Sequence, residues 1–264
     1  MHSPATDREW FTAIASLVAS HDADQAMRAL EDIIDSSVRH GGTCLLAFHR
    51  SAPPEVLHHT LDPAGERHYV DRYLAGPYLL DPLYQLAVQD DVPDVCRYRD
   101  EAPDRFRSSE YYRQYCERTH LKDEVDFLRR VDPTSTLALV VGRREKRFVK
   151  GDISTLQNIA PLVNAALEKI WRLSPLRQAD RADGRSMHRQ LIHCFDHFGE
   201  GLLTDREQQI TQHLLRGYST KAIARQLGIA PGTVMVHKRN LFTKLGISSQ
   251  YELFSQFIEA LSTS

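Results

Sequence analysis

The residues best suited to chemistry lie near the C-terminus, in the stretch KAIARQLGIAPGTVMVHKRNLFTKLGI that runs from Lys221 to Ile247. Its second half predicts a helix that buries one stripe formed by Val234, Leu241 and Leu245. A helix of about fourteen residues is about 21 Å long, which suits insertion into the major groove of DNA. The face opposite the buried stripe presents Thr233, Met235, Val236, Arg239 and Thr243.

Charge is distributed unevenly along the chain. The whole sequence of 264 residues carries a formal net charge of −2. Residues 203–250 contain seven lysine and arginine side chains against only Asp205 and Glu207, so this segment is at +5 and the rest of the chain at −7. The C-terminal part therefore suits a polyanion, and the remainder would be repelled by one.

A second group of residues, of types that can bind a metal, lies in the second half of the chain. His193 and His197 are four residues apart, a spacing that can chelate a metal on one helix face, and His188 and Cys194 lie close by. The same segment also reads as a short helix packed beside a linker. Because no outer ligands can be identified, metal binding stays open, and we expect no cofactor.

Catalysis is not expected. Candidate nucleophiles such as Cys44, Cys96 and Cys116 have no signature context, and neither a phosphate-binding glycine loop, GxSxG nor HExxH occurs. The four cysteines lack CxxC spacing, so a disulfide framework is not expected. The sequence shows no signal peptide and no apolar run of about eighteen residues, which predicts a cytoplasmic protein without a membrane partner.

Local signals predict how the basic stretch is positioned. Thr204 and Glu207 form a capping box that begins a helix ending near Gly217. A short helix spans 220–227, Gly228 permits a tight turn, and Pro231 begins the next helix. This pattern predicts a helix-turn-helix; the competing interpretation is a plain three-helix bundle.

The N-terminal part mixes helical and strand patterns. Apolar spacing predicts helices near residues 7–20, 24–40 and 151–171, and strands over 43–49, 55–61, 124–131 and 136–144. The uneven spacing favours an antiparallel sheet between helices over repeated βαβ units. The predicted fold class is α+β, with an α/β/α sandwich sensor domain over 1–171, a linker over 172–199 and a four-helix helix-turn-helix domain over 200–264.

Residues 203–250 resemble the DNA-binding domain of NarL/LuxR-family bacterial transcription regulators. The motifs that carry this resemblance are LTDRE, IARQLGI, GTV and KLGISS. It implies a dimer on DNA, RNA polymerase as a partner, and a fourth helix whose Leu253, Phe257 and Leu261 form part of the dimer seam. By position, Met235, Val236 and Arg239 would face bases, whereas Lys221, Thr233, Lys238 and Lys244 would contact phosphates. Ala222, Ala230 and Met235 depart from the family's usual Glu, Ser and Lys.

HYVDRYLAGPYLLDPLY, over residues 68–84, resembles the autoinducer-binding domain of LuxR-type quorum-sensing regulators. The resemblance implies that Tyr69, Tyr73, Tyr78 and Asp81 line a ligand pocket. The alternative is that Asp81 and Pro82 are an ordinary helix start and the tyrosines are core residues. A phosphorylated receiver domain does not fit, because Asp90 and Asp91 precede a proline-rich loop instead of following the first strand.

The sequence therefore predicts a homodimeric regulator that binds an inverted repeat in double-stranded DNA and is controlled by a small-molecule effector. The only tryptophans are Trp10 and Trp171, so the usual pocket tryptophan is missing and a standard acyl-homoserine lactone is not the expected ligand. An acyl-homoserine lactone receptor and a regulator controlled by a protein partner remain alternatives.

Overall fold

The computed structural model describes residues 8–60, 70, 72–175 and 182–263. A five-stranded antiparallel sheet forms its centre, in the order β2-β1-β5-β4-β3. The strands are β1 (Gly42–His49), β2 (Glu55–His59), β3 (Val95–Arg97), β4 (Asp123–Asp132) and β5 (Ser135–Arg143). The antiparallel pairing confirms the predicted sheet. The three-residue β3 is too short to show alternation and was not predicted.

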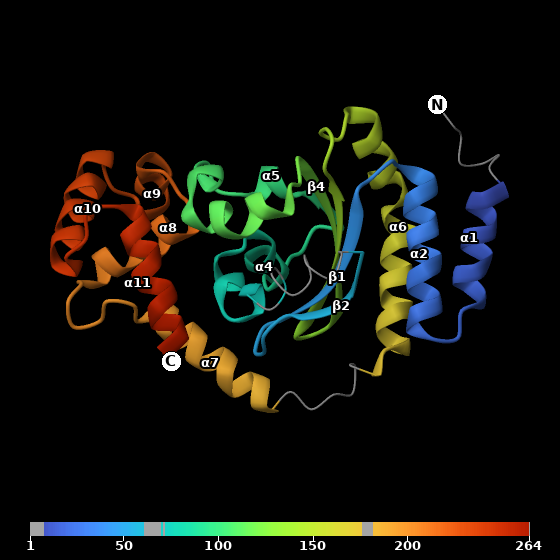
Figure 1. The fold of residues 1–264 in the computed structure, drawn as a ribbon, viewed down its shortest axis with the longest axis horizontal. Coiled ribbons are helices and arrows are strands. Elements are labelled where there is room, and N and C mark those ends of the chain that lie inside the picture. The colour runs from blue at the N-terminus through green and yellow to red at the C-terminus, as the bar shows by residue number, and fades with distance from the viewer. Residues whose placement is uncertain (1–7, 61–69, 71, 176–181, 264) are drawn as a thin grey trace.

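Three long helices cover one face of the sheet. Helices α2 (Ala23–Ser37) and α6 (Lys150–Leu173) pack on the strands, and α1 (Arg8–Ala19) packs outside α2 (Figure 1). The Asp22 carboxylate begins α2 by accepting a hydrogen bond from the Gln25 amide at 2.7 Å. Alternate strand residues such as Val125, Phe127 and Leu139 fill this core. These helices confirm the predicted outer layer.

Short helical segments cover the opposite face. They are η2 (Pro77–Leu80), α4 (Pro82–Ala87), α5 (Tyr98–Glu101), η3 (Phe106–Ser108), η4 (Tyr112–Cys116) and η5 (Glu117–Thr119). Figure 1 shows α4 and α5 between the sheet and the C-terminal helices. Residues of this layer and of the sheet together line a cavity.

The C-terminal helices are α8 (Asp205–Arg216), α9 (Thr220–Leu227), α10 (Pro231–Leu245) and α11 (Gln250–Thr263). The predicted capping box between Thr204 and Glu207 begins α8. Gly217, Gly228 and Gly246 end α8, α9 and α10 with φ of 91°, 65° and 67°, a left-handed conformation that costs glycine little. The predicted helix-turn-helix is therefore present, and Ala230 begins α10 without a side-chain cap.

Helix α7 (Ala182–Asp196) lies within the segment that we predicted to be a linker. Leu191 and Phe195 on α7 are buried against the C-terminal helices and the short helical layer. Their side chains join one continuous apolar cluster that includes Phe48 and Tyr84 on one side and Phe257 on the other. Residues 182–196 are thus an ordered bridge between the two parts of the chain (Figure 1).

The dimer seam inferred for α11 needs correction. Leu253, Phe257 and Leu261 are 1%, 0% and 6% exposed, because they pack inside the same chain. The Phe257 ring contacts Phe195 edge-on, with ring centroids 5.5 Å apart. These three side chains are therefore not available to a second copy in this conformation. Within the described residues, no helix is both long and apolar enough to cross a membrane.

Candidate DNA interface and ligand cavity

Helix α10 presents an exposed face to solvent. Val234 and Leu241 are fully buried, whereas the Met235 and Val236 side chains are 64% and 46% exposed. Arg239 and Thr233 are exposed on the same helix. Large apolar side chains on a surface next to a cation are typical of a contact surface, and an aliphatic chain can contact a thymine methyl. Met235, Val236 and Arg239 thus lie where the sequence predicts a base-reading surface, and Thr233, predicted to contact phosphate, lies beside them.

The three predicted phosphate-binding lysines differ in their surroundings. Lys221 is exposed in the first turn of α9. Lys238 is half-buried, its Nζ lies 5.3 Å from the centre of the Phe242 ring, and burial followed by the nearby Arg105 lowers its pKa. Lys244 donates a hydrogen bond to the buried Glu207 carboxylate at 2.6 Å. Lys244 therefore ties α10 to α8, a role that the sequence did not suggest.

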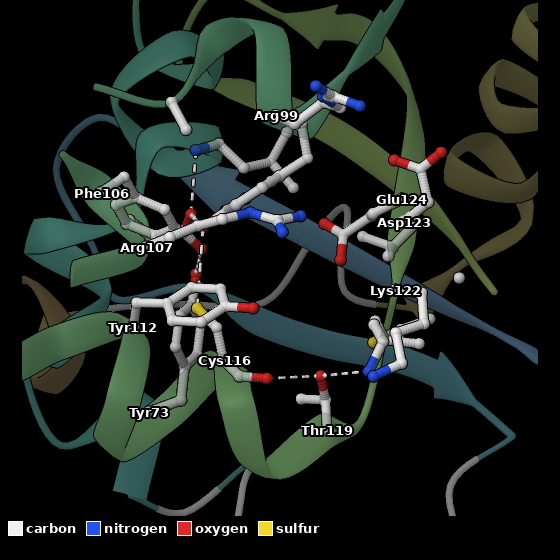
Figure 2. Close-up of a pocket in the computed structure, with 18 of the residues that line it drawn as sticks. Tyr73, Arg99, Phe106, Arg107, Tyr112, Cys116, Thr119, Lys122, Asp123 and Glu124 are labelled. Atoms are coloured by element: carbon white, nitrogen blue, oxygen red, sulfur yellow. Dashed lines mark hydrogen bonds between the residues drawn. The ribbon is translucent and has the colours of Figure 1, made fainter. Parts of the chain in front are cut away.

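A cavity of about 540 Å³ lies between the sheet and the short helical layer (Figure 2). This volume lies in the range of about 300–1,000 Å³ that small-molecule sites occupy. Leu46, Val56 and Val140 line it from the strands, and Leu83, Phe106 and Tyr112 line it from the covering layer. Figure 2 shows Tyr73, Tyr112 and Cys116 on one side of the cavity, and Lys122 with Asp123 and Glu124 at the start of β4 on the other.

Tyr73 and Asp81 belong to a hydrogen-bonded network in the cavity wall. The Asp81 carboxylate accepts bonds from the Tyr73 hydroxyl at 2.7 Å, the Tyr98 hydroxyl at 3.0 Å and the Leu83 amide at 2.9 Å. Burial raises the pKa of Asp81, and these three bonds oppose the rise. Asp81 is therefore both the N-cap of α4 and part of the cavity wall, so the two interpretations of this residue are compatible.

The other two predicted ligand residues are not in this wall. Tyr78 is fully buried outside the cavity, and its hydroxyl hydrogen-bonds His188 Nδ1 of α7 at 2.7 Å. Burial lowers the pKa of His188, so the ring is neutral and its Nδ1 accepts a hydrogen bond from the Tyr78 hydroxyl. The prediction that Tyr78 lines the ligand pocket therefore needs correction, because its side chain bonds α7 instead of lining the cavity. Tyr69 lies outside the described residues.

The sequence did not single out several residues of the cavity wall. Tyr98, Phe106 and Tyr112 come from the short helical segments α5, η3 and η4, and Glu124 comes from the start of β4. The one available signal is in β4, where the alternating pattern of DEVDFL places carboxylates at Glu124 and Asp126, at positions that face away from the helical core.

The segment 102–109 belongs to both the cavity and the C-terminal contact. Residues 102–108 line the cavity. On the other side, the Arg105 amide donates to the Gly217 carbonyl at 3.1 Å, and the Asp104 carboxylate accepts from the Ser219 amide at 2.9 Å. Gly217 and Ser219 form the turn that joins α8 to α9. One segment therefore contacts both the ligand space and the helix-turn-helix.

The histidine cluster does not form a metal site in the described part of the chain. His193 and His197 stack with ring centroids 4.0 Å apart, and His188 is hydrogen-bonded to Tyr78. No group of three or more histidine, cysteine or acidic side chains among the described residues could hold an ion. All four cysteines are free thiols.

Comparison with known proteins agrees with this architecture. Residues 201–256 match the family described as bacterial regulatory proteins, luxR family (GerE). The HTH-type transcriptional regulator in the exeN 3′ region of Aeromonas salmonicida is 34% identical over 159 residues, which cover 58% of this chain and 81% of that protein. The monoamine regulon transcriptional regulator of Klebsiella aerogenes is 25% identical over 207 residues, 78% of each chain.

The N-terminal part is similar to a solved structure. The VqsR LBD domain from Pseudomonas aeruginosa superposes with a TM-score of 0.55 and 25% identity, and the match covers 64% of this chain and 99% of that domain. The relatives are DNA-binding regulators, which confirms that the chain is not an enzyme. The chain belongs to the luxR family of bacterial regulatory proteins, and it is a DNA-binding transcription regulator with an autoinducer-binding-like N-terminal domain.

Proposed function

We propose that a small molecule bound in the cavity controls how this regulator binds promoter DNA. The observation that carries the proposal is the shared segment 102–109, which lines the cavity and bonds the turn between α8 and α9. A ligand that shifts this segment changes the strength of the docking contact. The segment 102–109 is either docked on the turn between α8 and α9 or released from it. The ligand can shift this equilibrium only if it binds the two arrangements with different affinities.

The hydrogen-bonded part of the docking contact is small. It contains two hydrogen bonds, from Arg105 to Gly217 and from Ser219 to Asp104, and Asp104 is exposed to solvent. Bonds of this kind contribute about 0.5–1.5 kcal/mol each. The apolar packing of α7 and α11 against Gly76 adds to the contact, since a Cβ at Gly76 would lie 3.1 Å from Leu261 and 3.3 Å from Leu191.

DNA reading is assigned to the exposed face of α10. Arg239 is the proposed base-contacting cation, and Met235 and Val236 supply apolar contacts beside it. Lys221, Thr233 and Lys238 are the proposed phosphate contacts. Two copies of the chain would read an inverted repeat whose half-sites are about one helical turn apart. The dimer surface must differ from the buried seam residues, and RNA polymerase is the proposed downstream partner.

Two substitutions test the assignment on DNA. Arg239→Ala should weaken binding to the selected site more than binding to random DNA, because it removes a base contact. Lys221→Ala should weaken both by similar factors and reduce the salt dependence, because it removes a phosphate contact. Fluorescence anisotropy over a salt series measures both effects. Equal losses on specific and random DNA for Arg239→Ala would contradict its base-reading role.

Native mass spectrometry of the protein purified from its own host tests ligand control. The expected result is a dissociable mass of a few hundred daltons. Removing this molecule should change DNA affinity in the wild-type protein. The change should be smaller in Asp104→Ala, because the segment then no longer bonds Ser219. A molecule that leaves DNA affinity unchanged in both proteins would refute control through the cavity.

A further inference from the structure

We infer that the cavity takes an amphipathic organic acid, with its carboxylate held by Arg107 and Lys122 and its apolar body between the sheet and the short helical layer. This inference rests on the proposed ligand-binding function and names the chemical class of the ligand. Three observations carry it: the cations in the wall, the partners that the acids in the wall already have, and a second cavity that meets the first.

Cations line the cavity where its wall reaches the surface. Five positively charged side chains belong to the wall, and all of them are exposed to solvent: Arg99, Arg105, Arg107, Lys122 and Arg144. Figure 2 shows Arg99, Arg107 and Lys122 around the same space as Phe106 and Tyr112. Among the described residues, Arg99 pairs with Asp100 at 3.7 Å and the other four cations form no ion pair. Their charges are therefore available to a ligand.

The acids in the wall do not neutralise these cations. Asp81 accepts three hydrogen bonds, and Asp123 pairs with Arg97. The Asp104 carboxylate accepts a backbone amide from the turn before α9. Glu124 is half-buried and forms no ion pair within the described part of the chain. Burial, and then the nearby Asp81, raises the pKa of Glu124 to about 8, so this carboxyl is largely protonated at neutral pH.

A second cavity, of about 500 Å³, meets the first and extends its cationic surface. Lys146 and Arg147 add two cations to the second wall, whose acids are Glu117 and Glu145. Lysine and arginine side chains there outnumber acids by four to two. The two cavities share four wall residues: Arg107, Tyr112, Leu121 and Lys122. Arg107 and Lys122 thus lie where the first cavity meets a surface of net positive charge, which attracts anions.

The remainder of the first wall is largely apolar. Its strand and helical residues include Leu46, Val56, Leu83, Phe106 and Val140. An aliphatic or aromatic body is therefore stabilised there by leaving water. A carboxylate would lose its hydration without gaining a partner among these side chains, so it stays at the cationic edge. The Arg107 guanidinium can donate two parallel hydrogen bonds to a carboxylate, and Lys122 adds a second positive charge.

Three probes of one length but different charge test this inference: octanoate, octanol and octylamine. A second set, 3-phenylpropionate with its alcohol and its amine, covers an aromatic body. Isothermal titration calorimetry of the full chain measures all six affinities. Each acid should bind about twofold to thirtyfold tighter than its alcohol, the range for two exposed ion pairs, and each amine should bind more weakly than the alcohol.

Salt provides a separate readout of the charge. Between about 0.05 M and about 0.5 M sodium chloride the advantage of each acid over its alcohol should shrink, because exposed ion pairs are screened. Failure of both acids to bind, or tighter binding of the alcohols or amines in both sets, would overturn the inference.

Variants separate the two proposed cations from a general charge effect. Arg107→Met and Lys122→Met retain long apolar side chains, and each should lose part of the advantage of the acid. The double variant should bind acid and alcohol about equally. Arg113→Met is the matched control, because Arg113 is an exposed cation on η4 that lines neither cavity, and it should retain the advantage. Thermal denaturation checks that each variant is folded. An unchanged advantage in the double variant, or an equal loss in Arg113→Met, would refute the assignment.

These readouts do not involve DNA, so the two proposals can fail separately. If acids bind through Arg107 and Lys122 without altering DNA affinity, control through the cavity fails and the ligand class stands. If a neutral molecule or an amine alters DNA affinity through the cavity and the acids do not bind, ligand control stands and the organic acid is refuted.

Discussion

Gly217→Ala should release the helix-turn-helix from the N-terminal part of the chain. Gly217 ends α8 with φ of 91°, where an alanine costs about 1–2 kcal/mol. Its added methyl group would lie 3.0 Å from the Phe106 Cα and 3.2 Å from the Ser109 Cβ. Carbon atoms prefer about 3.5–4.0 Å, so the segment 102–109 must move away.

Gly246→Ala is the matched control. Gly246 ends α10 with φ of 67°, so the conformational cost is similar, but no atom lies within 4 Å of its new Cβ. The difference between the two substitutions is the overpacking at Gly217, roughly 1–3 kcal/mol. That difference should lower the docking equilibrium constant by about fivefold to a hundredfold.

Amide hydrogen exchange reports docking directly, because Arg105 and Ser219 donate the two hydrogen bonds across the contact. Both amides should exchange faster in Gly217→Ala by about the same factor and stay protected in Gly246→Ala. Ser219 also belongs to the turn, so the Arg105 amide is the more decisive probe. Equal exchange of Arg105 in the two variants would refute the reasoning.

Three further predictions concern ionisable groups. Lys244→Ala should lower the free energy of unfolding by about 1 kcal/mol, because it leaves the Glu207 carboxylate without its cation. Burial opposes ionisation of Glu207, but hydrogen bonds from Lys244 and Thr204 prevail and lower its pKa. The loss of stability in Lys244→Ala, measured by urea denaturation, should therefore vanish as pH falls through the pKa of Glu207. His188 has a pKa lowered by burial, so wild-type stability should fall as pH drops through about 6.5, where the unfolded histidine takes up a proton. Thermal denaturation of His188→Gln should lack that dependence. Glu124 retains its proton up to about pH 8 when folded, so wild-type stability should fall between about pH 4.3 and 8, and Glu124→Gln should have the higher Tm at pH 8. An equal Tm difference at pH 5 and pH 8 would contradict this explanation.

The C-terminal helices could be predicted because their signals are local. The Thr204–Glu207 capping box and Gly217 and Gly228 each act within a few residues of a helix end, so the sequence contains the whole interaction. The stripe with Val234 and Leu241 likewise identified the buried side of α10. The exposure of Met235 and Arg239 followed from that stripe.

The cavity could be predicted only in part, because its wall depends on contacts between distant segments. Asp81 was found through its own helix start, whereas Tyr98 bonds to it from 17 residues away and Tyr78 turns toward His188, 110 residues away. No local pattern distinguishes these two tyrosines. Phe257 was misassigned for the same reason, since an apolar helix stripe does not show whether its partner is Phe195 or a second chain.

The apolar cluster that runs from Phe48 and Tyr84 through Phe195 to Phe257 bears on how this protein can be divided. A fragment that ended after α6 would leave the surface around Gly76 and Phe106 facing water, and the remaining fragment from α7 to α11 would expose Leu191 and Leu261. Each fragment would expose an apolar surface patch that is covered in the whole chain. Fusions that exchange one half for that of a relative should therefore carry α7 and the residues facing it from the same parent. Otherwise the side chains at this contact would pack poorly in the hybrid protein, and the hybrid would tend to aggregate.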